Sequence, residues 1–219
     1  MAMLTKPVRE LYSNIRGELI RLHYRRLLIS QLFTSPDTNE LLNNAAVRFF
    51  TTLKWDLLDT ITVAISRLTD PPTTRGFNNA SMQQLIRNLD SGAFPDLVKS
   101  LNAIHAELKS EAVRIINWRN KWSGHRDFDV VEGRVPLPAI SLVEVDKALG
   151  LIGKFLNEFE VVFQDIPKEI NLYDNPELAK ELDEMERLKI FPPIPYEDRI
   201  FLPDNGNTVI ELVRKALLS

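Results

Sequence analysis

The residues of this chain that are best suited to binding or catalysis lie between Arg114 and Asp127, in the sequence RIINWRNKWSGHRD. Four basic residues and no acidic residue lie between Arg114 and Arg126, although the whole chain has a formal net charge of -3. Guanidinium and ammonium groups gathered in this way attract phosphates and carboxylates. The composition of the stretch therefore predicts a local anion-binding site.

Arg119 occupies an unusual position within this stretch. The preceding helix is expected to start at Phe94-Pro95, and its apolar stripe is Leu97, Leu101, Ile104, Leu108, Ala112 and Ile115. The same spacing continues to Arg119 and Trp122. Because an unpaired guanidinium on an apolar face is costly, Arg119 should have a partner, or should face a cleft or another subunit.

Gly124 connects Arg119 to His125. Residues six apart on a continuous helix point to different faces, but glycine readily adopts the left-handed conformation that ends many helices. We expect the chain to turn at Gly124, so that His125 shares a pocket with Arg119. Asn120 could hydrogen-bond a backbone group or a phosphate oxygen, or fix one histidine tautomer. The basic side chains could also do no more than stabilise the last carbonyls of a helix.

Arg16 and His23 have a similar spacing near the N-terminus. Among 16 arginines and three histidines, about 0.7 such pairs are expected by chance, so the spacing alone is weak evidence. This pair is expected in the middle of a helix, with side chains roughly 10 Å apart along the axis, too far to act on one phosphate from one chain. Nearby arginines could add phosphate contacts if the helix lines the cleft: Arg21, Arg25 and Arg26.

Other side chains of the region have simpler interpretations. Trp118 and Trp122 are expected to be core or dimer-interface aromatics, and His105 a structural histidine. His125, Asp127 and Asp129 form a poor metal site without further histidines or cysteines nearby, so no metal and no other cofactor is expected.

Apolar periodicity and capping residues predict the elements that hold this stretch. The expected helices cover residues 6–33, 36–69, 82–89, 95–122 and 142–164. The stripe of the second is Leu42, Ala46, Phe49, Leu53, Leu57, Ile61, Ala64 and Leu68. Residues 126–138 are expected to form a polar loop, and only residues 200–202 resemble a strand.

Composition places this bundle in a broad class. The chain is 44% hydrophobic and 26% charged with 8 glycines, which favours an all-α fold. It has no cysteine, hence no disulfide and no thiol nucleophile. No apolar run is long enough for a membrane span, so we expect a cytoplasmic protein without membrane contact. A pI near 5.7 argues against nonspecific coating of nucleic acid.

Charge and proline content divide the chain near residue 165. Residues 1–164 hold 20 basic and 18 acidic residues, whereas residues 165–219 hold 7 and 12. We expect a helical bundle of four to five helices over residues 1–165, followed by an acidic, Pro-rich and partly helical C-terminal extension over residues 166–219. The acidic helix expected at residues 176–189 is a solvated or docked appendage, or a cover for a basic site.

The motif and its setting resemble a known superfamily. The residues Arg119-Asn120-Lys121 and Gly124-His125-Arg126-Asp127, at the end of the third long helix of a bundle, resemble the HEPN superfamily and, more narrowly, its branch associated with bacterial abortive infection. The resemblance covers roughly residues 1–165. It implies a helical bundle, usually a homodimer that brings two motifs to one cleft, with metal-independent RNA cleavage in active members.

The resemblance also implies roles for individual residues. His125 would assist proton transfer, Arg119 would neutralise charge on the scissile phosphate, and Asn120 would orient His125 or the phosphate. The residues expected to bind neighbouring RNA phosphates are Arg114, Lys121 and Arg126. The cleaved ends would be a 2′,3′-cyclic phosphate and a 5′-hydroxyl, with an antitoxin or regulatory protein as a further partner. The alternative is a noncatalytic module that binds a protein, nucleotide or RNA.

Overall fold

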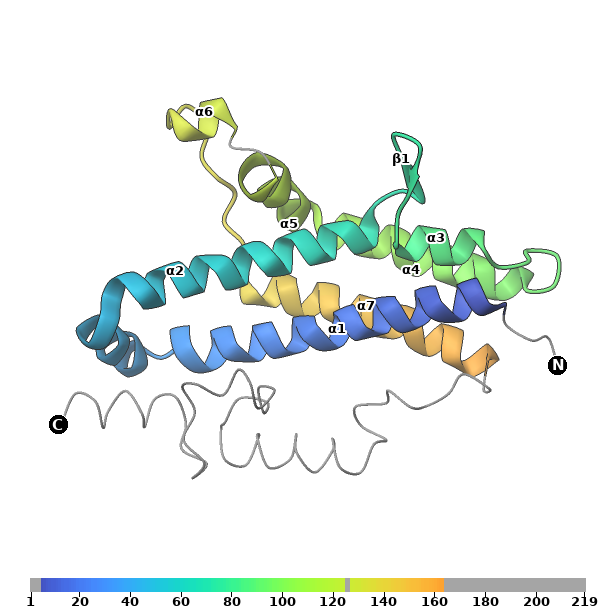
Figure 1. The fold of residues 1–219 in the computed structure, drawn as a ribbon, viewed down its shortest axis with the longest axis horizontal. Coiled ribbons are helices and arrows are strands. Elements are labelled where there is room, and N and C mark those ends of the chain that lie inside the picture. The colour runs from blue at the N-terminus through green and yellow to red at the C-terminus, as the bar shows by residue number, and fades with distance from the viewer. Residues whose placement is uncertain (1–4, 125–126, 164–219) are drawn as a thin grey trace, which may run out of the picture. The chain divides into compact units, whose positions relative to one another are not determined.

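The protein is mostly helical in the residues that the computed structural model describes, which are 5–124 and 127–163 (Figure 1). Its elements are α1 (Lys6–Phe33), α2 (Pro36–Thr69), β1 (Thr73–Thr74), β2 (Phe77–Asn78), α3 (Met82–Arg87), α4 (Pro95–Glu111), α5 (Val113–Trp118), the π-helix η1 (Arg119–Ser123), α6 (Phe128–Val131) and α7 (Leu142–Val162). The predicted all-α bundle is confirmed. The extension over residues 166–219, with its expected helices and strand, lies outside the described residues.

Two compact units divide the chain. Within the described residues, the first combines residues 5–23 with residues 59–124 and 127–163, and the second consists of Tyr24–Leu58. Helices α1 and α2 each contribute residues to both units. The motif stretch belongs to the first unit.

The core of the first unit is built around α4 and α7, which pack along each other, with α3 against α4 (Figure 1). The stripe predicted for α4 is buried at every position from Leu97 to Ile115. Each such side chain contributes about 1.5–3 kcal/mol when it leaves water. Helix α7 begins with the predicted capping box, in which Ser141 and Glu144 cap each other's backbone N–H groups.

The N-terminal part of α1 packs on α7 through a buried tyrosine. The Tyr12 ring stacks on Phe159 with centroids 5.1 Å apart, and its hydroxyl donates a hydrogen bond to Glu160. Burial and the neighbouring carboxylate raise the pKa of Tyr12, so the hydroxyl remains a donor. This contact fixes the two helices to each other within the first unit.

The described part of the second unit contains a break that the sequence did not predict. Ala46 has non-helical φ and ψ of -162° and 69°, although α2 continues on both sides of it. The break shifts the apolar stripe, so the assignment of Phe49 to it was wrong: Phe49 is 63% exposed, and Phe50 packs with Leu32 and Leu42 instead. A stripe extrapolated across a break points to the wrong face.

A short hairpin between α2 and α3 was also missed. Strands β1 and β2 pair antiparallel, and the turn residues Arg75 and Gly76 have positive φ values of 49° and 85°. Two positive φ values are typical of a type I′ hairpin turn. The strands are two residues long and follow Pro71-Pro72, so they carry no usable alternation.

The segment expected to be a polar loop contains a helix of one turn. Asp127 caps α6, because its carboxylate accepts hydrogen bonds from the backbone N–H groups of Asp129 and Val130 at 3.0 and 3.3 Å. The prediction of a polar loop over residues 126–138 was therefore wrong for Phe128–Val131, which form α6. Among residues 5–124 and 127–163, the helices are too short or too polar to cross a membrane.

Candidate functional site

Asp59 on α2 fixes both ends of the turn that carries the motif. Its Oδ1 accepts a hydrogen bond from Trp118 Nε1 at 3.0 Å and another from Ser123 Oγ at 2.8 Å. The Trp118 side chain is 6% exposed, which confirms the prediction of a core aromatic. Since Trp118 precedes the π-helix and Ser123 ends it, one carboxylate clamps the whole turn from Arg119 to Ser123.

The backbone widens into a π-helix where the motif begins. The N–H of Gly124 donates to the carbonyl of Arg119, five residues earlier, with a nitrogen–oxygen distance of 2.6 Å. Such wider turns are rare and occur mainly at functional sites. The widening changes the direction in which Arg119 and the following residues point relative to a regular α-helix.

Gly124 is needed for a different reason from the one the sequence suggested. Its φ and ψ are -85° and -37°, in the right-handed region, so the prediction of a left-handed helix end was wrong. A Cβ at this position would lie 2.9 Å from the carbonyl oxygen of Arg119. The close approach of two backbone segments across the π-turn therefore excludes a side chain at Gly124.

Arg119 has the partner that its position required. Its Nη2 lies 3.7 Å from Asp70 Oδ2, and its Nη1 donates to the amide oxygen of Asn120 at 3.0 Å. The side chain is 33% exposed, so the guanidinium reaches solvent. Burial raises the pKa of Asp70, and the nearby charge of Arg119 opposes that rise. Of the predicted catalytic residues, the structure brings Arg119 and Asn120 together.

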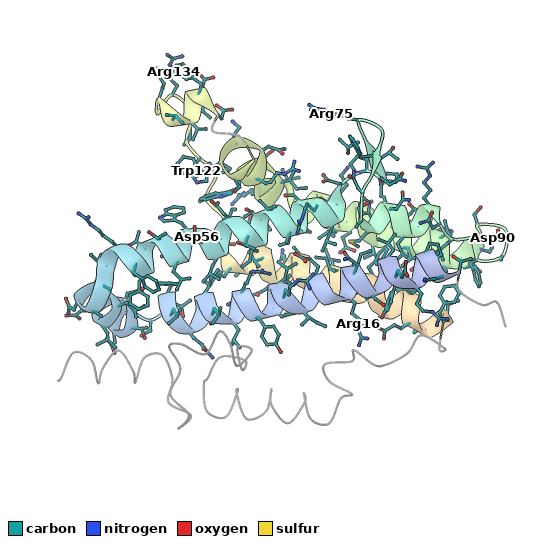
Figure 2. The ribbon with its side chains drawn as sticks, in the orientation of Figure 1. Arg16, Asp56, Arg75, Asp90, Trp122 and Arg134 are labelled. Carbon is teal, nitrogen blue, oxygen red and sulfur yellow. The ribbon has the colours of Figure 1, made fainter. Side chains whose placement is uncertain are left out.

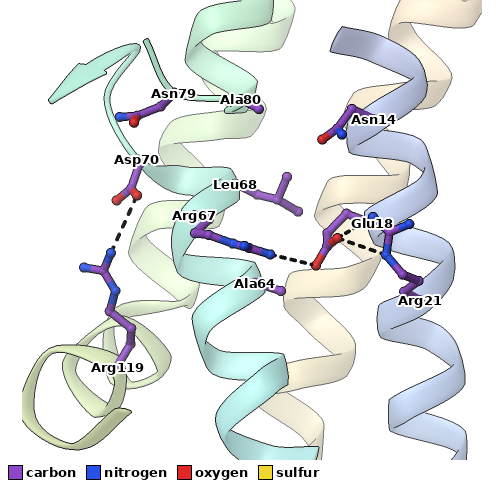
Figure 3. Close-up of a pocket in the computed structure, with 10 residues that line it drawn as sticks. All are labelled: Asn14, Glu18, Arg21, Ala64, Arg67, Leu68, Asp70, Asn79, Ala80 and Arg119. Carbon is purple, nitrogen blue, oxygen red and sulfur yellow. Dashed lines mark hydrogen bonds and ion pairs between the residues drawn. The ribbon is translucent and has the colours of Figure 1, made fainter. Parts of the chain in front are cut away.

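Arg119 and Asp70 lie at one edge of a pocket of about 550 Å³ (Figure 3). The pocket is lined by α1, by the end of α2 and by the segment after it; its remaining lining residues are Asn14, Glu18, Arg21, Ala64, Arg67, Leu68, Asn79 and Ala80. On the far side Glu18 accepts from Arg21 and Arg67, at 2.6 and 3.2 Å (Figure 3). Three arginines against two carboxylates leave the lining with a formal charge of +1.

The residues predicted to bind phosphates are less closely grouped. Arg114 is exposed, and its Nε lies 3.4 Å from Glu144 at the start of α7. The backbone N–H and the hydroxyl of Ser141 donate to Glu144 and, together with the charge of Arg114, lower its pKa and keep it charged. Lys121 is half-buried on the π-turn beside Trp122, which Figure 2 labels. His125 and Arg126 lie outside the described residues.

The second arginine–histidine pair has a structural role. Arg16, labelled in Figure 2, points to α7, where its Nε lies 3.8 Å from Glu160 Oε1, and its side chain is 13% exposed. Helix α1 continues without a break through His23 to Phe33. Arg21 on the same helix does line the pocket, so one arginine of the cluster noted in the sequence faces the site.

His105 is a core histidine, as predicted. It is 3% exposed, and its Nε2 is buried without a hydrogen-bond partner in the described structure. Burial and the charge of Lys109 lower its pKa, while a hydrogen bond with the backbone of Thr69 opposes them, so the neutral form is favoured. Within the described ranges no three histidine or acidic side chains are grouped to hold a metal ion.

A comparison with protein families assigns the chain. Residues 5–182 match the family HEPN_AbiU2, described as AbiU2. The chain belongs to the AbiU2 family of HEPN proteins. The match includes the whole motif stretch and continues beyond residue 165, where the sequence predicts the end of the bundle. No curated protein and no solved structure matches the chain.

The AbiU2 family is related to abortive infection, and HEPN proteins are often ribonucleases. In this AbiU2 chain, sequence reasoning missed three charged residues that share the pocket with Arg119: Glu18, Arg67 and Asp70. Asp70 directly follows the predicted helix over residues 36–69 and precedes Pro71-Pro72, so it looked like part of a helix end. The sole signal for Arg67 and Asp70 was that two charges lie at the end of an apolar helix, which many exposed helix ends also show.

Proposed function

We propose that this protein is a metal-independent endoribonuclease that leaves 2′,3′-cyclic phosphate and 5′-hydroxyl ends. The observation that carries the proposal is the placement of Arg119, which lies half-exposed at the edge of a pocket, on a π-turn that leads directly to Gly124-His125. A cation at the edge of a cavity and an imidazole a few residues away are the two groups that this reaction requires.

In the proposed reaction the 2′-oxygen of a ribose attacks the adjacent phosphorus, and the bond from phosphorus to the 5′-oxygen breaks. A base removes the proton of the 2′-hydroxyl, and an acid protonates the leaving 5′-oxygen. His125 performs one of these transfers, which suits an imidazole near neutral pH. Arg119 stabilises the charge that grows on the phosphate oxygens. No oxidant, reductant or metal enters this balance.

Asn120 serves this reaction by orienting the guanidinium. Its amide oxygen accepts a hydrogen bond from Arg119 Nη1, which fixes the plane of the fork. Asp70 Oδ2 lies 3.7 Å from Arg119 Nη2, the other terminal nitrogen of the guanidinium. At this distance the ion pair is weak enough for a phosphate to compete for Arg119. Arg114, Lys121 and Arg126 bind the phosphates on either side of the cleaved bond, and Arg114 must then exchange Glu144 for RNA.

The proposal includes a second copy of the chain. In a homodimer, two sets of Arg119 and His125 would meet in one cleft and form a composite active site. A nuclease of this kind must be restrained in the cell, so we include an antitoxin or regulatory protein as partner and phage defence as the setting. The relation of the family to abortive infection supports this setting.

One observation favours a noncatalytic function instead. Arg119 and Arg114 already have carboxylate partners, Asp70 and Glu144, as expected of arginines that stabilise a fold. In that case the protein is a module that binds an RNA, nucleotide or protein partner without cleaving RNA. The two functions predict different results in a cleavage assay.

The test is RNA cleavage in EDTA by the full chain and by His125→Ala. We expect wild-type cleavage with 2′,3′-cyclic phosphate ends, and loss of that activity in the variant. RNA that remains intact with wild type, or cleavage that is equal in both proteins, would overturn the ribonuclease proposal. Binding of RNA without cleavage would support the noncatalytic module.

A further inference from the structure

The half of the pocket opposite Arg119 has features that cleavage at Arg119 and His125 does not require. Arg21 and Arg67 converge there on Glu18, whose side chain is 13% exposed (Figure 3). The two arginine side chains are 52% and 59% exposed. Both therefore present part of their guanidinium groups to solvent while one carboxylate holds them in place.

This arrangement keeps N–H groups available for a further anion. A guanidinium has five N–H donors, whereas the bonds to Glu18 use two donors of Arg21 and one of Arg67. The two positive charges exceed the single negative charge of Glu18. A phosphate can therefore bind Arg21 and Arg67 without displacing the carboxylate.

The wall between the two charged edges is apolar and small. Leu68 and Ala64 are 2% and 1% exposed and close the pocket from below, so the exposed Ala80 beyond α2 is the apolar side chain that a ligand can touch. These side chains leave room within the pocket volume of about 550 Å³, which falls in the range of about 300–1,000 Å³ typical of sites for small molecules. A flat, weakly polar group such as a nucleobase suits a wall of this kind.

Two amides flank that wall. Asn14 is exposed on α1 and can both donate and accept. Asn79 uses its Nδ2 group to donate to the Pro71 carbonyl at 2.7 Å and to Thr74 Oγ1 at 2.8 Å, which leaves its Oδ1 as the group that it can offer to a ligand. The hairpin thus fixes the amide of one residue that lines the pocket.

We propose that this pocket is a subsite for one nucleotide of the RNA next to the cleaved bond. Arg67 and Arg21 bind its phosphate, Ala80 contacts its base, and Asn14 and Asn79 border the base edge. The inference rests on the proposed function for the identity of the polymer. It goes further by assigning a second phosphate position and a base position to residues outside the motif.

The test measures binding separately from cleavage. The probe is a short RNA with 2′-O-methyl groups at every ribose, which removes the attacking hydroxyl, and affinity is measured in EDTA for the full chain. The variants are Arg67→Ala and Asn14→Ala. Arg87→Ala, on α3 and outside the pocket lining, removes the same charge from an exposed site and serves as the control.

We expect Arg67→Ala to weaken binding about tenfold, the effect of losing a charged hydrogen bond to phosphate. Asn14→Ala should weaken it about threefold, in line with a neutral hydrogen bond, and Arg87→Ala less than about twofold. Glu18→Gln should act in the opposite direction and tighten binding, because it removes the negative charge of the pocket. Unfolding curves identify any variant that loses stability.

Equal affinity of wild type, Arg67→Ala and Asn14→Ala for the probe would overturn the subsite, even if the wild type cleaves RNA. Inorganic phosphate that competes with the probe as well as 5′-AMP does would reduce the pocket to an anion site and overturn the base position. If the wild type binds the probe through Arg67 but cleaves no unmodified RNA, the ribonuclease proposal fails and the subsite stands. In an active enzyme Arg67→Ala should raise KM and leave kcat nearly unchanged.

Discussion

This chain has two arginine–histidine strings of similar spacing, residues 16–23 and 119–125. The backbone that carries the arginine differs between them. Arg16 and His23 lie on α1, an uninterrupted α-helix, and Arg16 is bound to Glu160 in the contact between α1 and α7. Arg119 lies on a π-turn at the edge of a pocket, with Gly124 and His125 directly after it. The difference shows that the spacing of two residues does not define a site by itself. The backbone conformation decides whether their side chains reach a pocket.

The largest expected effect comes from removing each arginine in turn. Arg119→Ala should lower the rate of RNA cleavage by about 100- to 1,000-fold, the range for loss of one group that stabilises transition-state charge. Arg16→Ala should lower the free energy of unfolding, because its partner Glu160 also accepts a hydrogen bond from the buried Tyr12 hydroxyl. It should leave the cleavage rate per folded molecule nearly unchanged. Single-turnover cleavage, normalised to folded protein, distinguishes the two. Equal losses of rate would remove the contrast between the strings.

The two glycines beside the strings should respond in opposite directions to alanine. Gly124→Ala places a Cβ 2.9 Å from the Arg119 carbonyl and should cost about 1–3 kcal/mol of stability, with at least a tenfold fall in cleavage. Gly17→Ala meets only Arg21 Nη1 at 3.5 Å and should stabilise α1 by about 0.5–1 kcal/mol. Chemical denaturation measures both values. A Gly124→Ala variant as stable as wild type would show that the π-turn is not required.

The clamp at Asp59 gives an intermediate effect. Asp59→Ala removes the carboxylate that accepts from both Trp118 Nε1 and Ser123 Oγ and should cost about 1–3 kcal/mol, because two hydrogen bonds to one acceptor are lost. Cleavage should fall as well, since Asp59 no longer connects the two ends of the turn. Trp118→Phe removes the indole donor while keeping an aromatic ring, and is the matched control. If Asp59→Ala lowers stability but leaves cleavage unchanged, the clamp serves the fold alone.

Asp70 should give the smallest effect. Asp70→Asn removes a partly exposed ion pair and should change the free energy of unfolding by less than about 1 kcal/mol. Because burial raises the pKa of Asp70 above its ordinary value of 3.8, the folded protein binds this proton more tightly than the unfolded chain does. The contribution of Asp70 is thus most favourable at low pH and is lost as the pH rises through the folded pKa.

The measurement is the stability difference between wild type and Asp70→Asn over about pH 3.5 to 6, which cancels the other carboxylates. Wild type should lose stability relative to the variant as the pH rises. RNA affinity of Asp70→Asn should increase, since phosphate no longer competes with Asp70 for Arg119. A fall in affinity would mean that Asp70 orients Arg119 for RNA instead of competing with it.

Much of the fold could be predicted because its signals are local. The stripe of α4 and the capping box at Ser141 depend on residues within a few positions of each other, and both are confirmed. The breaks at Ala46 and Ala112, and the widening at Arg119, were not predicted. No residue type there forbids a regular helix, so tertiary contacts such as those of Asp59 decide the backbone.

The site could be predicted only in part for a related reason. The apolar stripe showed that Arg119 needed a partner, but the partner, Asp70, lies 49 residues earlier in the chain. The pocket is lined by residues of α1, α2 and the hairpin segment. These segments lie far apart in the chain, and a single sequence does not show that they meet. The placement of His125 relative to Arg119 stays a prediction, because His125 lies outside the described residues.

The central claim is that the string at Arg119 is catalytic and the string at Arg16 is not. The most direct measurement compares RNA cleavage in EDTA by two matched variants, His125→Ala and His23→Ala. We predict that His125→Ala cleaves at least about 100-fold more slowly than wild type, while His23→Ala retains nearly the full rate. Loss of activity in His23→Ala with activity retained in His125→Ala would contradict the claim.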